Sequence, residues 1–332
     1  MIKAAFVSSS ENWVWTRQFP NLEPIWNNVY FDFSNNLENC DILFVFDALP
    51  TKYCGKIKAR KCVFIASEPQ NVKVYSSKFL RQFDLIVTTD KTSQHPNAIY
   101  QQPGLPWHAG VWSEFNRLSN VPLTFDFFSD YQPKKSKLIS VISSDKAFTE
   151  EHRARLRFVD ALKSHFGDRI DYFGRNICSF TDKMEALSQY KYHISLENCA
   201  ILDYWTEKLS DPFLTLTYPI YHGCPNVDDY FPEGALSKID IRDTEESISK
   251  IEHIINSSLA EESESLLKES RRRVLFEHNL FSILAKIAIS LNQDESGGYK
   301  KLESEKFFIK NTSTLRRYRK RLSRRIVNLL GE

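Results

Sequence analysis

Three blocks between Tyr192 and Gly223 hold residue types that bind charged sugar derivatives. The first, Tyr-His-Ile-Ser-Leu-Glu-Asn, ends at Asn198; the second is Tyr204-Trp-Thr-Glu-Lys208, and the third is Pro219-Ile-Tyr-His-Gly223. The first block is an apolar strand that ends in Glu197 and Asn198. Ligands of α/β proteins bind at the carboxyl ends of the sheet strands. The pattern therefore predicts a polar binding site at this edge of a sheet.

The second block predicts the start of a helix that could hold an anion. Thr206, Glu207 and Lys208 occupy its first turn, where backbone N–H groups have no partner within the helix. Lys208 adds a full positive charge, and Glu207 offers an acceptor for sugar or ribose hydroxyls. The residues indicate a site for a phosphorylated sugar or a nucleotide.

Motifs of several other enzyme classes are absent. The chain has no GxxxxGK[ST], GxGxxG, HExxH or GxSxG segment, so the usual sequence support for an ATPase, a dinucleotide-binding enzyme, a zinc protease or a hydrolase is missing. The six cysteines form no CxxC pair and no Cys/His cluster, which favours reduced thiols. The pair Asp228-Asp229 fits a solvated loop. We expect no metal and no cofactor besides a donor substrate.

Short apolar runs predict the elements that position the site. Four runs of strand length lie before residue 110, at residues 4–7, 41–46, 62–66 and 85–88, and they are typical of a buried parallel sheet. A Pro-, Ser- and Lys-containing stretch at 128–137 then interrupts the pattern. We expect an N-terminal α/β lobe over residues 1–130 and a second lobe over 137–295.

The second lobe repeats the alternation of strands and helices. We expect a helix after Thr149, a helix over Thr181–Tyr190 and one over Thr206–Leu216 that tolerates Pro212. The expected strands are Leu138–Ser143, Ile170–Phe173, Tyr192–Leu196, Pro219–Tyr221 and Ile239–Ile241. A long helical region should follow from Thr244 to about Leu291. Two such lobes predict an enzyme with a cleft between them.

The three blocks resemble the signature of glycosyltransferase family 10, the α-1,3/4-fucosyltransferases. That signature reads approximately F-E-N-S, then Y-[VT]-T-E-K, then P-[IV]-Y-W-G. This chain has Leu196-Glu-Asn-Cys199, Tyr204-Trp-Thr-Glu-Lys208 and Pro219-Ile-Tyr-His-Gly223 at matching spacing. The resemblance covers residues 137–245 well and the N-terminal half weakly.

The resemblance implies the GT-B fold, with two Rossmann-like lobes, and an inverting transfer from GDP-fucose without a covalent intermediate. In this chain Arg155, Arg175 and Lys208 would then neutralise the diphosphate, because an arginine fork can bind two phosphate oxygens. Single displacement also needs a general base for the acceptor hydroxyl. Glu68, in Cys62-Val-Phe-Ile-Ala-Ser-Glu-Pro69, resembles the family's N-terminal Glu and is the expected catalytic residue.

The remaining implied donor contacts are Asn198, Tyr204 and Glu207. Four positions depart from the family signature: Leu196, Cys199, Trp205 and His222. Since a changed pocket alters specificity before reaction class, a different nucleotide-activated sugar stays open as an alternative. A non-catalytic membrane-surface or nucleic-acid-binding protein on a transferase scaffold is the alternative from another class.

A second aromatic segment, Pro106-Trp-His-Ala-Gly110, suits a sugar-binding loop because aromatic and His residues precede a glycine. His108 and Trp112 are candidate acceptor contacts. A plain packing role for both residues stays open.

The charge distribution separates the C-terminus from the rest of the chain. Of the 332 residues, 44 are Lys or Arg and 42 are Asp or Glu, but residues 306–332 hold nine basic residues and one acid. The tail is therefore about +8 and the body about −6, which argues against a uniformly basic nucleic-acid-binding surface. No run reaches the roughly 18 apolar residues of a membrane span, and the short apolar run at residues 4–7 is too short for a signal peptide.

Residues 314–330 predict a basic amphipathic helix. Five apolar residues recur there at steps of three and four, with seven Arg and Lys largely between them. Such a helix binds an anionic leaflet, with about 1 kcal/mol from each basic residue near the surface. We expect a cytoplasmic enzyme attached to the inner face of the membrane by residues 306–332, acting on lipopolysaccharide or another surface glycan. Docking of this helix on the acidic body, or binding to nucleic acid, stays open.

Overall fold

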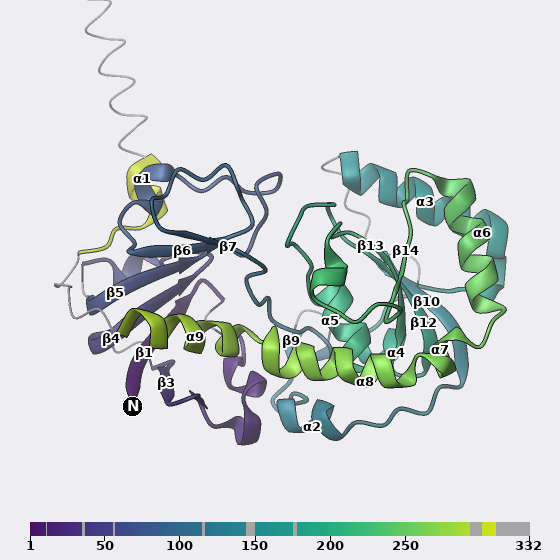
Figure 1. Cartoon of the computed structure of the whole chain (residues 1–332), viewed down its shortest axis with the longest axis horizontal. Helices are drawn as coiled ribbons and strands as arrows, with labels where there is room; N and C mark the ends of the chain where they lie inside the picture. The colour runs from purple at the N-terminus through teal and green to yellow at the C-terminus, as the bar shows by residue number, and fades with distance from the viewer. Residues whose placement is uncertain are drawn as a thin grey trace, which may run out of the picture. The chain divides into compact units, whose positions relative to one another are not determined.

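The computed structural model of the chain describes residues 1–10, 12–34, 37–55, 57–114, 117–143, 150–174, 178–292 and 301–309. Two compact units divide the chain. The N-terminal unit comprises residues 1–11, 28–100 and 287–332, and the C-terminal unit comprises residues 12–27 and 101–286. Figure 1 shows the sheet of each unit with its helices.

The N-terminal unit is built on parallel strands in the order β3-β1-β4-β5-β6-β7. Their bounds are β1 Ile2–Ser8, β3 Val29–Asp32, β4 Glu38–Phe46, β5 Lys58–Ile65, β6 Leu85–Thr88 and β7 Ala98–Tyr100. The central strands are buried on both faces: Phe44 and Val45, neighbours in β4 whose side chains lie on opposite faces of the sheet, are both fully buried. Burial on both faces explains why these strands read as continuous apolar runs. Helix α1, Ser77–Leu80, packs Phe79 into this core.

Residues 301–309 return to the N-terminal unit. Leu302 is fully buried in its core, the Leu302 carbonyl accepts from the Gly55 N–H, and Gln82 makes two hydrogen bonds to the Glu303 backbone. Residues 305–309 are helical. The predicted amphipathic helix at 314–330 lies outside the described residues, so its membrane role stays a prediction.

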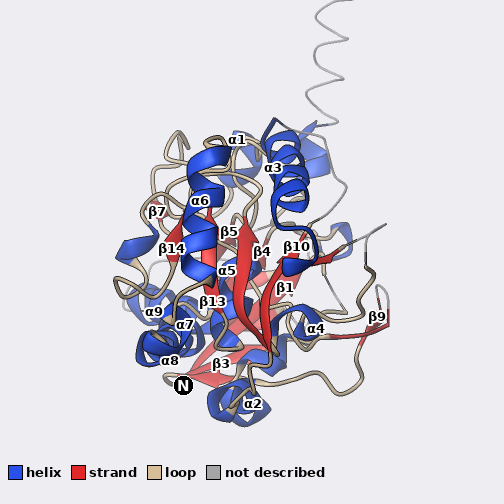
Figure 2. Cartoon of the chain, turned by 90° about the vertical axis from the view of Figure 1, so that its right-hand side faces the viewer, coloured by secondary structure: helices blue, strands red, loops and turns tan. Residues whose placement is uncertain are grey.

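The C-terminal unit holds a five-stranded parallel sheet in the order β11-β10-β12-β13-β14. The strands are β10 Lys137–Ile142, β11 Asp171–Phe173, β12 Tyr190–Leu196, β13 Tyr218–His222 and β14 Ser237–Lys238. The helices are α2 Phe125–Asp130, α3 Glu150–Phe166, α4 Met184–Leu187, α5 Glu207–Leu214, α6 Thr244–Ile255, α7 Leu259–Glu262 and α8 Glu264–Arg272. Figure 2 shows strands in red among blue helices.

The smaller elements complete the chain. A short ribbon pairs β8 Trp112–Glu114 with β9 Arg117–Leu118, and β2 Ile25–Trp26 lies in the segment 12–27. A π-helix, Arg273–Glu277, follows α8, and α9 spans Leu280–Asn292. No single helix within the described ranges is long and apolar enough to cross a membrane, although the bent pair Glu264–Glu277 and Leu280–Asn292 passes that test of length and composition when taken together.

The unit boundaries differ from the expected lobes: the chain from residue 287 groups with the N-terminal unit, whereas residues 12–27 and 101–130 group with the C-terminal unit. Buried contacts within that unit explain the difference. The Phe19 ring stacks on Phe281 at 4.3 Å, and Trp26 lies 6.0 Å from the Phe125 ring. The composition of the sequence predicts a linker near residue 130, whereas the C-terminal unit resumes at residue 101.

Three expected elements of the C-terminal unit need correction. The helix expected over residues 181–190 is the single turn α4, and β12 begins at Tyr190. Residues 239–241 are not a strand, since β14 ends at Lys238. The helical region from Thr244 is broken into several helices, and the segments Glu264–Glu277 and Leu280–Asn292 meet at a bend of 45°. The capped start of α5 at Thr206 is confirmed, and Pro212 lies inside that helix.

Candidate donor site

The site is built where the chain passes from β12 into α5. Glu197 follows the last residue of the strand and is only 1% exposed. Its carboxylate accepts hydrogen bonds from the Thr206 backbone N–H, at 2.8 Å, and from the Thr206 hydroxyl. Thr206 Oγ1 in turn accepts from the Lys208 N–H at 3.2 Å and so caps α5. The buried carboxylate therefore fixes the first turn of the helix against the end of the strand.

Gly223, at the end of the third block, lets β13 approach this carboxylate. A Cβ at position 223 would lie 2.5 Å from Glu197 Cγ and 2.4 Å from Tyr221 Oη. Both atoms belong to buried side chains. Moving Glu197 would disturb the cap of α5, and moving Tyr221 would break its hydrogen bond from the Cys224 N–H. The glycine of this block is thus required by a close approach and not by its backbone angles.

We expect Gly223→Ala to disturb the site more than the fold. Displacement of Glu197 would release the Thr206 cap, so the variant should bind nucleotide at least about tenfold more weakly. Its free energy of unfolding should be about 1–3 kcal/mol lower than that of the wild type. Calorimetric nucleotide titration and urea unfolding measure the two effects. Gly167→Ala is the control, because a Cβ there meets open space although φ is +52°; unchanged nucleotide affinity in Gly223→Ala would contradict the close-approach argument.

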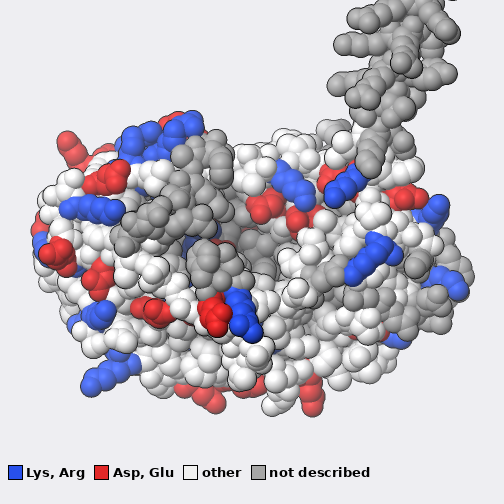
Figure 3. Space-filling view, turned by 180° about the vertical axis from the view of Figure 1, so that it is seen from behind, with Lys and Arg blue, Asp and Glu red and all other residues white. Residues whose placement is uncertain are grey.

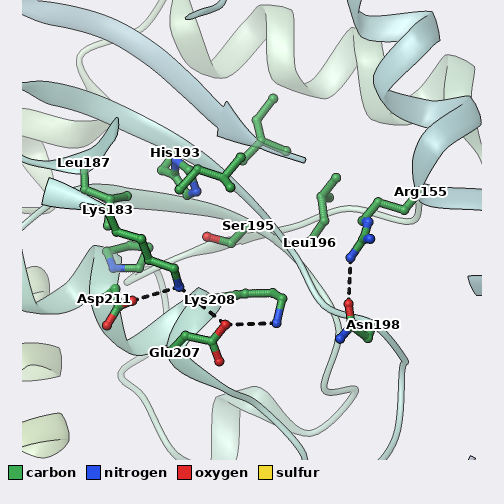
Figure 4. A pocket seen from close by; sticks show the side chains of 13 residues that line it. Arg155, Lys183, Leu187, His193, Ser195, Leu196, Asn198, Glu207, Lys208 and Asp211 are labelled. Atoms are coloured by element: carbon green, nitrogen blue, oxygen red, sulfur yellow. Dashed lines mark hydrogen bonds and ion pairs between the residues drawn. The ribbon is translucent and has the colours of Figure 1, made fainter. Parts of the chain in front are cut away.

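A cavity of about 220 Å³ lies beside the start of α5. Figure 4 shows the side chains that line it. They come from β10, α3, the start of α4, β12 and α5: Ile142, Arg155, Lys183, Leu187, His193, Ile194, Ser195, Leu196, Asn198, Glu207, Lys208, Asp211 and Pro212. Three cations and two carboxylates therefore share one small space.

Charged pairs join most of these groups. Lys208 Nζ lies 3.1 Å from Glu207 Oε1 and 3.7 Å from Glu197 Oε2. Lys183 Nζ lies 2.9 Å from Asp211 Oδ2 and 3.4 Å from Glu207 Oε1 (Figure 4). Asp211 is fully buried. Glu207 is thus held between two lysines, and each lysine keeps a second carboxylate partner.

Electrostatics keeps Glu207 and Lys208 ionised. Burial by itself raises the pKa of Glu207, but Lys183 and Lys208 outweigh it and hold that pKa well below its usual value. Burial lowers the pKa of Lys208, whereas Glu207 and Glu197 raise it above its ordinary value. Burial raises the pKa of Glu197, although Lys208 and Thr206 oppose this. At neutral pH the site therefore offers a positive ammonium beside a carboxylate acceptor.

Arg155 and Asn198 form a second group in the cavity. Arg155, on α3, is 3% exposed and donates from Nη1 to Asn198 Oδ1 at 2.6 Å. Burial lowers the pKa of the guanidinium, and Glu197 partly restores it; an arginine stays charged at neutral pH. Asn198 follows β12 directly after Glu197, so the strand end links the two groups.

Four of the six donor-binding residues expected from the sequence come together here: Arg155, Asn198, Glu207 and Lys208. Tyr204 is 5% exposed before α5 and is not among the described residues that line the cavity. Its expected donor contact stays a prediction. Arg175 lies outside the described residues. Glu68 belongs to the N-terminal unit.

Sequence reasoning missed Lys183 and Asp211. Lys183 is the residue before α4, and Asp211 lies one turn after Lys208 on α5. Asp211 could be found from its spacing, because i and i+4 of a helix share a face and Glu207 precedes it by four residues. Nothing local marks Lys183, since its partners lie more than twenty residues away.

His193 and Ser195 were also missed, and both face the cavity from β12. The Ser140 hydroxyl donates to the Ala186 carbonyl, so the 2.8 Å contact between Ser140 Oγ and His193 Nδ1 has the imidazole as donor. His193 Nε2 is then an acceptor, and burial lowers the pKa of His193 to about 3. The Ser195 hydroxyl is buried with no hydrogen-bond partner in the described chain, so it is available to a ligand.

The four departures from the family signature lie in different surroundings. Leu196 lines the cavity, whereas Trp205 is buried against Phe231, with the ring centroids 5.1 Å apart. His222 is buried and hydrogen-bonds through Nδ1 to the Ile239 carbonyl. Cys199 is 1% exposed. Of the four, Leu196 is the one that the structure places among the cavity-lining residues, which narrows the positions that could change donor specificity.

Glu68 lies three residues after the end of β5, at the carboxyl edge of the N-terminal sheet. Its backbone N–H donates to Tyr75 Oη at 3.4 Å, and the Tyr75 hydroxyl donates to Asp47 Oδ1 at 2.6 Å. Lys73 Nζ pairs with the same carboxylate at 3.0 Å. Although burial raises the pKa of Asp47, Tyr75 and Lys73 lower it, so an ionised Asp47 anchors Tyr75 beneath the Glu68 backbone.

If Glu68 is the base, Tyr75→Phe should misplace it without touching the C-terminal unit. We expect kcat for transfer to fall about tenfold, by loss of two hydrogen bonds that hold the loop, with the Kd for GDP unchanged. Steady-state kinetics and calorimetry give the two numbers. Tyr100→Phe, on an exposed hydroxyl of the same unit, is the control; equal kcat in Tyr75→Phe and wild type would remove this positioning role.

Among the described residues no group of His, Cys, Asp and Glu could hold a metal ion, and all six cysteines are free. Figure 3 shows acidic and basic side chains interspersed on the face it presents, without one continuous basic area there.

Several known proteins are similar to this chain in sequence. Residues 132–265 match the family model described as the C-terminal part of glycosyltransferase family 10 (fucosyltransferase). A Helicobacter pylori α-(1,3)-fucosyltransferase is 36% identical over 106 residues, covering 30% of this chain and 22% of that protein. A Drosophila melanogaster α-(1,3)-fucosyltransferase is 27% identical over 203 residues, covering 56% and 43%. An Arabidopsis thaliana putative fucosyltransferase-like protein is 28% identical over 157 residues, covering 46% and 26%.

The fold is shared over a longer stretch. The crystal structure of an α1,3-fucosyltransferase with GDP-fucose matches with a TM-score of 0.50 and 18% identity, covering 90% of this chain and 92% of that one. The fold class is therefore confirmed as α/β of the GT-B type, with two parallel sheets. The fold is the one found in a glycosyltransferase structure, and residues 132–265 match the family model of the fucosyltransferases, family 10.

The sequence matches are partial. The chain spans between 22% and 43% of the length of the relatives named above. What those proteins transfer, and to which acceptor, is therefore a matter for proposal in this chain.

Proposed function

We infer that the protein transfers L-fucose from GDP-fucose to a hydroxyl group of a glycan, with inversion at the anomeric carbon. The observation that carries this proposal is the group of Arg155, Asn198, Glu207 and Lys208 around one cavity, in the segment that matches family 10.

The leaving group is a diphosphate, and its charge has to be stabilised as the sugar bond breaks. Arg155 is a buried cation at the cavity and Lys208 a partly buried one, with 25% of its side chain exposed, and preorganised positive groups stabilise developing charge strongly. The Lys208 side chain is already held by two carboxylates, so little reorganisation is needed when the donor binds. Glu207 and Asn198 supply acceptors for hydroxyl groups of the nucleotide sugar.

An inverting displacement takes place in one step. The acceptor hydroxyl attacks the anomeric carbon while the bond to the GDP oxygen breaks, and the hydroxyl proton passes to a general base. Glu68 is the proposed base, and its support is the resemblance of its segment together with its place at the carboxyl edge of the N-terminal sheet. His108 and Trp112 are proposed to contact the acceptor.

The proposals for the acceptor and for the cellular location are argued from the charge of the C-terminal tail. A net charge of about +8 over residues 306–332 supports attachment to an anionic membrane surface, and a lipid-linked or lipopolysaccharide glycan on the inner leaflet would then be at hand. Vesicle sedimentation measures this attachment. The full chain should co-sediment with vesicles that contain phosphatidylglycerol and release at high salt, whereas a chain ending at residue 309 should stay in solution.

A donor with another sugar is the second candidate, favoured by Leu196 at the cavity wall, where the family signature has Phe. Incubation with GDP-fucose, GDP-mannose and UDP-sugars, with a mixture of reducing-end-labelled oligosaccharides, separates the two. Transfer from GDP-fucose with an inverted anomeric centre in the product, read by NMR, supports the first proposal. If only another nucleotide sugar serves as donor, the proposed fucose is wrong, and the proposed reaction class, glycosyl transfer, is kept.

A further inference from the structure

The segment 107–112 of the C-terminal unit is held by buried charges along its backbone. Arg17 is 0% exposed and donates to the carbonyls of Trp107, at 2.8 Å, and Ala109. Asp211 accepts from the His108 N–H at 3.0 Å. Asp182 accepts from two further N–H groups of the segment, those of Gly110 and Trp112. A segment without regular structure up to Val111 is thus fixed by three charged side chains.

This clamp gathers three rings that are each partly exposed: Trp13, His108 and Trp112. We call them the ring cluster. The Trp13 and His108 centroids are 5.1 Å apart, those of Trp13 and Trp112 are 6.0 Å apart, and those of His108 and Trp112 are 6.3 Å apart. Half-exposed indoles beside an imidazole offer flat apolar faces together with polar edges.

The ring cluster contains an unused hydrogen-bond donor. The Trp13 indole nitrogen is buried and has no partner within the described chain. A buried N–H without an acceptor is unfavourable because it has lost its hydrogen bond to water, and indole can donate only. Its natural complement is a ligand that carries an oxygen acceptor next to an apolar face.

A hydrogen bond and an ion pair connect the ring cluster to the charged groups of the candidate donor cavity. His108 is tied through its N–H to Asp211, and Asp211 is tied to Lys183 at the cavity. Burial lowers the pKa of His108, while Glu207 raises it and Lys183 lowers it. His108 is therefore a neutral imidazole at neutral pH, able to donate one hydrogen bond and accept another.

We propose that the ring cluster is a subsite for a pyranose ring, in which Trp13 and Trp112 contact a sugar face and the Trp13 N–H and the His108 imidazole bind its hydroxyl groups. A pyranose has an apolar face of C–H groups and a rim of hydroxyls, so it matches both properties of the cluster. The evidence for the subsite is the fixing of segment 107–112 by Arg17, Asp182 and Asp211, together with the unpartnered Trp13 N–H. Its sugar is the donor fucose or the acceptor, and that assignment rests on the proposed function.

Trp13→Phe tests the subsite, because it keeps a ring and removes the N–H donor. Calorimetry on the full chain with GDP and with GDP-fucose forms one arm, and saturation-transfer NMR with the methyl glycosides of L-fucose, D-galactose and N-acetyl-D-glucosamine forms the other. If the donor sugar occupies the subsite, Trp13→Phe should weaken GDP-fucose about fivefold to tenfold and leave GDP unchanged. If the acceptor sugar occupies the subsite, Trp13→Phe should leave the affinity for GDP-fucose unchanged and should weaken the saturation-transfer signals of one methyl glycoside relative to the wild type.

Trp26→Phe is the matched control, because Trp26 is buried against Phe19 and Phe125 in the same unit and outside the ring cluster. Trp112→Leu, checked by thermal unfolding, gives a second loss of a sugar-facing ring. Failure of the wild type to bind GDP would count against the proposed function and leave the glycoside arm to decide the subsite alone. The proposal is overturned if no glycoside gives a signal with the wild type, and also if Trp13→Phe changes neither arm.

Discussion

Lys208→Met should lower kcat/KM for GDP-fucose transfer by about 10²–10³ while the chain stays folded. The ammonium is the cation of α5 that the geometry aims into the donor cavity, and loss of one preorganised charge at a leaving group has this order of effect. The Thr206 cap uses the Lys208 backbone N–H, which the substitution keeps. Glu207 retains Lys183 at 3.4 Å, so its carboxylate is not left without a cation.

Lys191→Met is the matched control for this variant. Lys191 lies on β12 and pairs with Glu261 on the surface, with 39% of its side chain exposed. Steady-state kinetics with GDP-fucose and circular dichroism on the three proteins separate a lost charge from a lost fold. A Lys208→Met enzyme within about threefold of wild type would mean that the diphosphate is neutralised elsewhere.

Arg17→Met should lower the free energy of unfolding by about 3–5 kcal/mol, because three carbonyls each lose a charged hydrogen-bond donor, at about 1–3 kcal/mol apiece. Arg17 is fully buried and donates to the carbonyls of Trp107, Ala109 and Leu123. Burial lowers the pKa of Arg17 to about 10, with Asp211 and Asp182 acting in the opposite sense. Its removal leaves three carbonyls without this donor and weakens the hold on the segment 107–112.

Urea unfolding followed by tryptophan fluorescence measures this change. Arg169→Met is the control, because Arg169 is 44% exposed and pairs with Glu252 on the surface of the same unit; surface pairs of this kind contribute about 1 kcal/mol or less. If Arg17→Met and Arg169→Met destabilise the protein equally, the segments 12–27 and 101–130 are not anchored through Arg17.

The donor site could be predicted where its residues are neighbours in the chain. Glu197, Thr206 and Lys208 lie within twelve residues, and a strand end followed by a helix start brings such residues to one edge of a sheet. The helix cap at Thr206 is likewise a local property. The local sequence pattern therefore predicts the end of β12, the start of α5 and the position of Lys208 at the cavity.

Contacts made across long sequence separations could not be predicted in this way. Arg17 meets acceptors about ninety to a hundred residues away, and this contact is why the segment 12–27 groups with the C-terminal unit. Lys183 meets Asp211 across 28 residues. No local pattern marks either residue, because a single Arg or Lys near a helix start is as common on a surface as in a site.

The central claim is that the cavity beside α5 binds a guanosine diphosphate sugar, and calorimetric titration of the full chain with GDP, UDP, CMP and dTDP tests it most directly. We expect GDP to bind at least about tenfold more tightly than the other three nucleotides, and Lys208→Met to lose that binding while Lys191→Met keeps it. Equal binding of all four nucleotides, or GDP binding that Lys208→Met leaves unchanged, would contradict the claim.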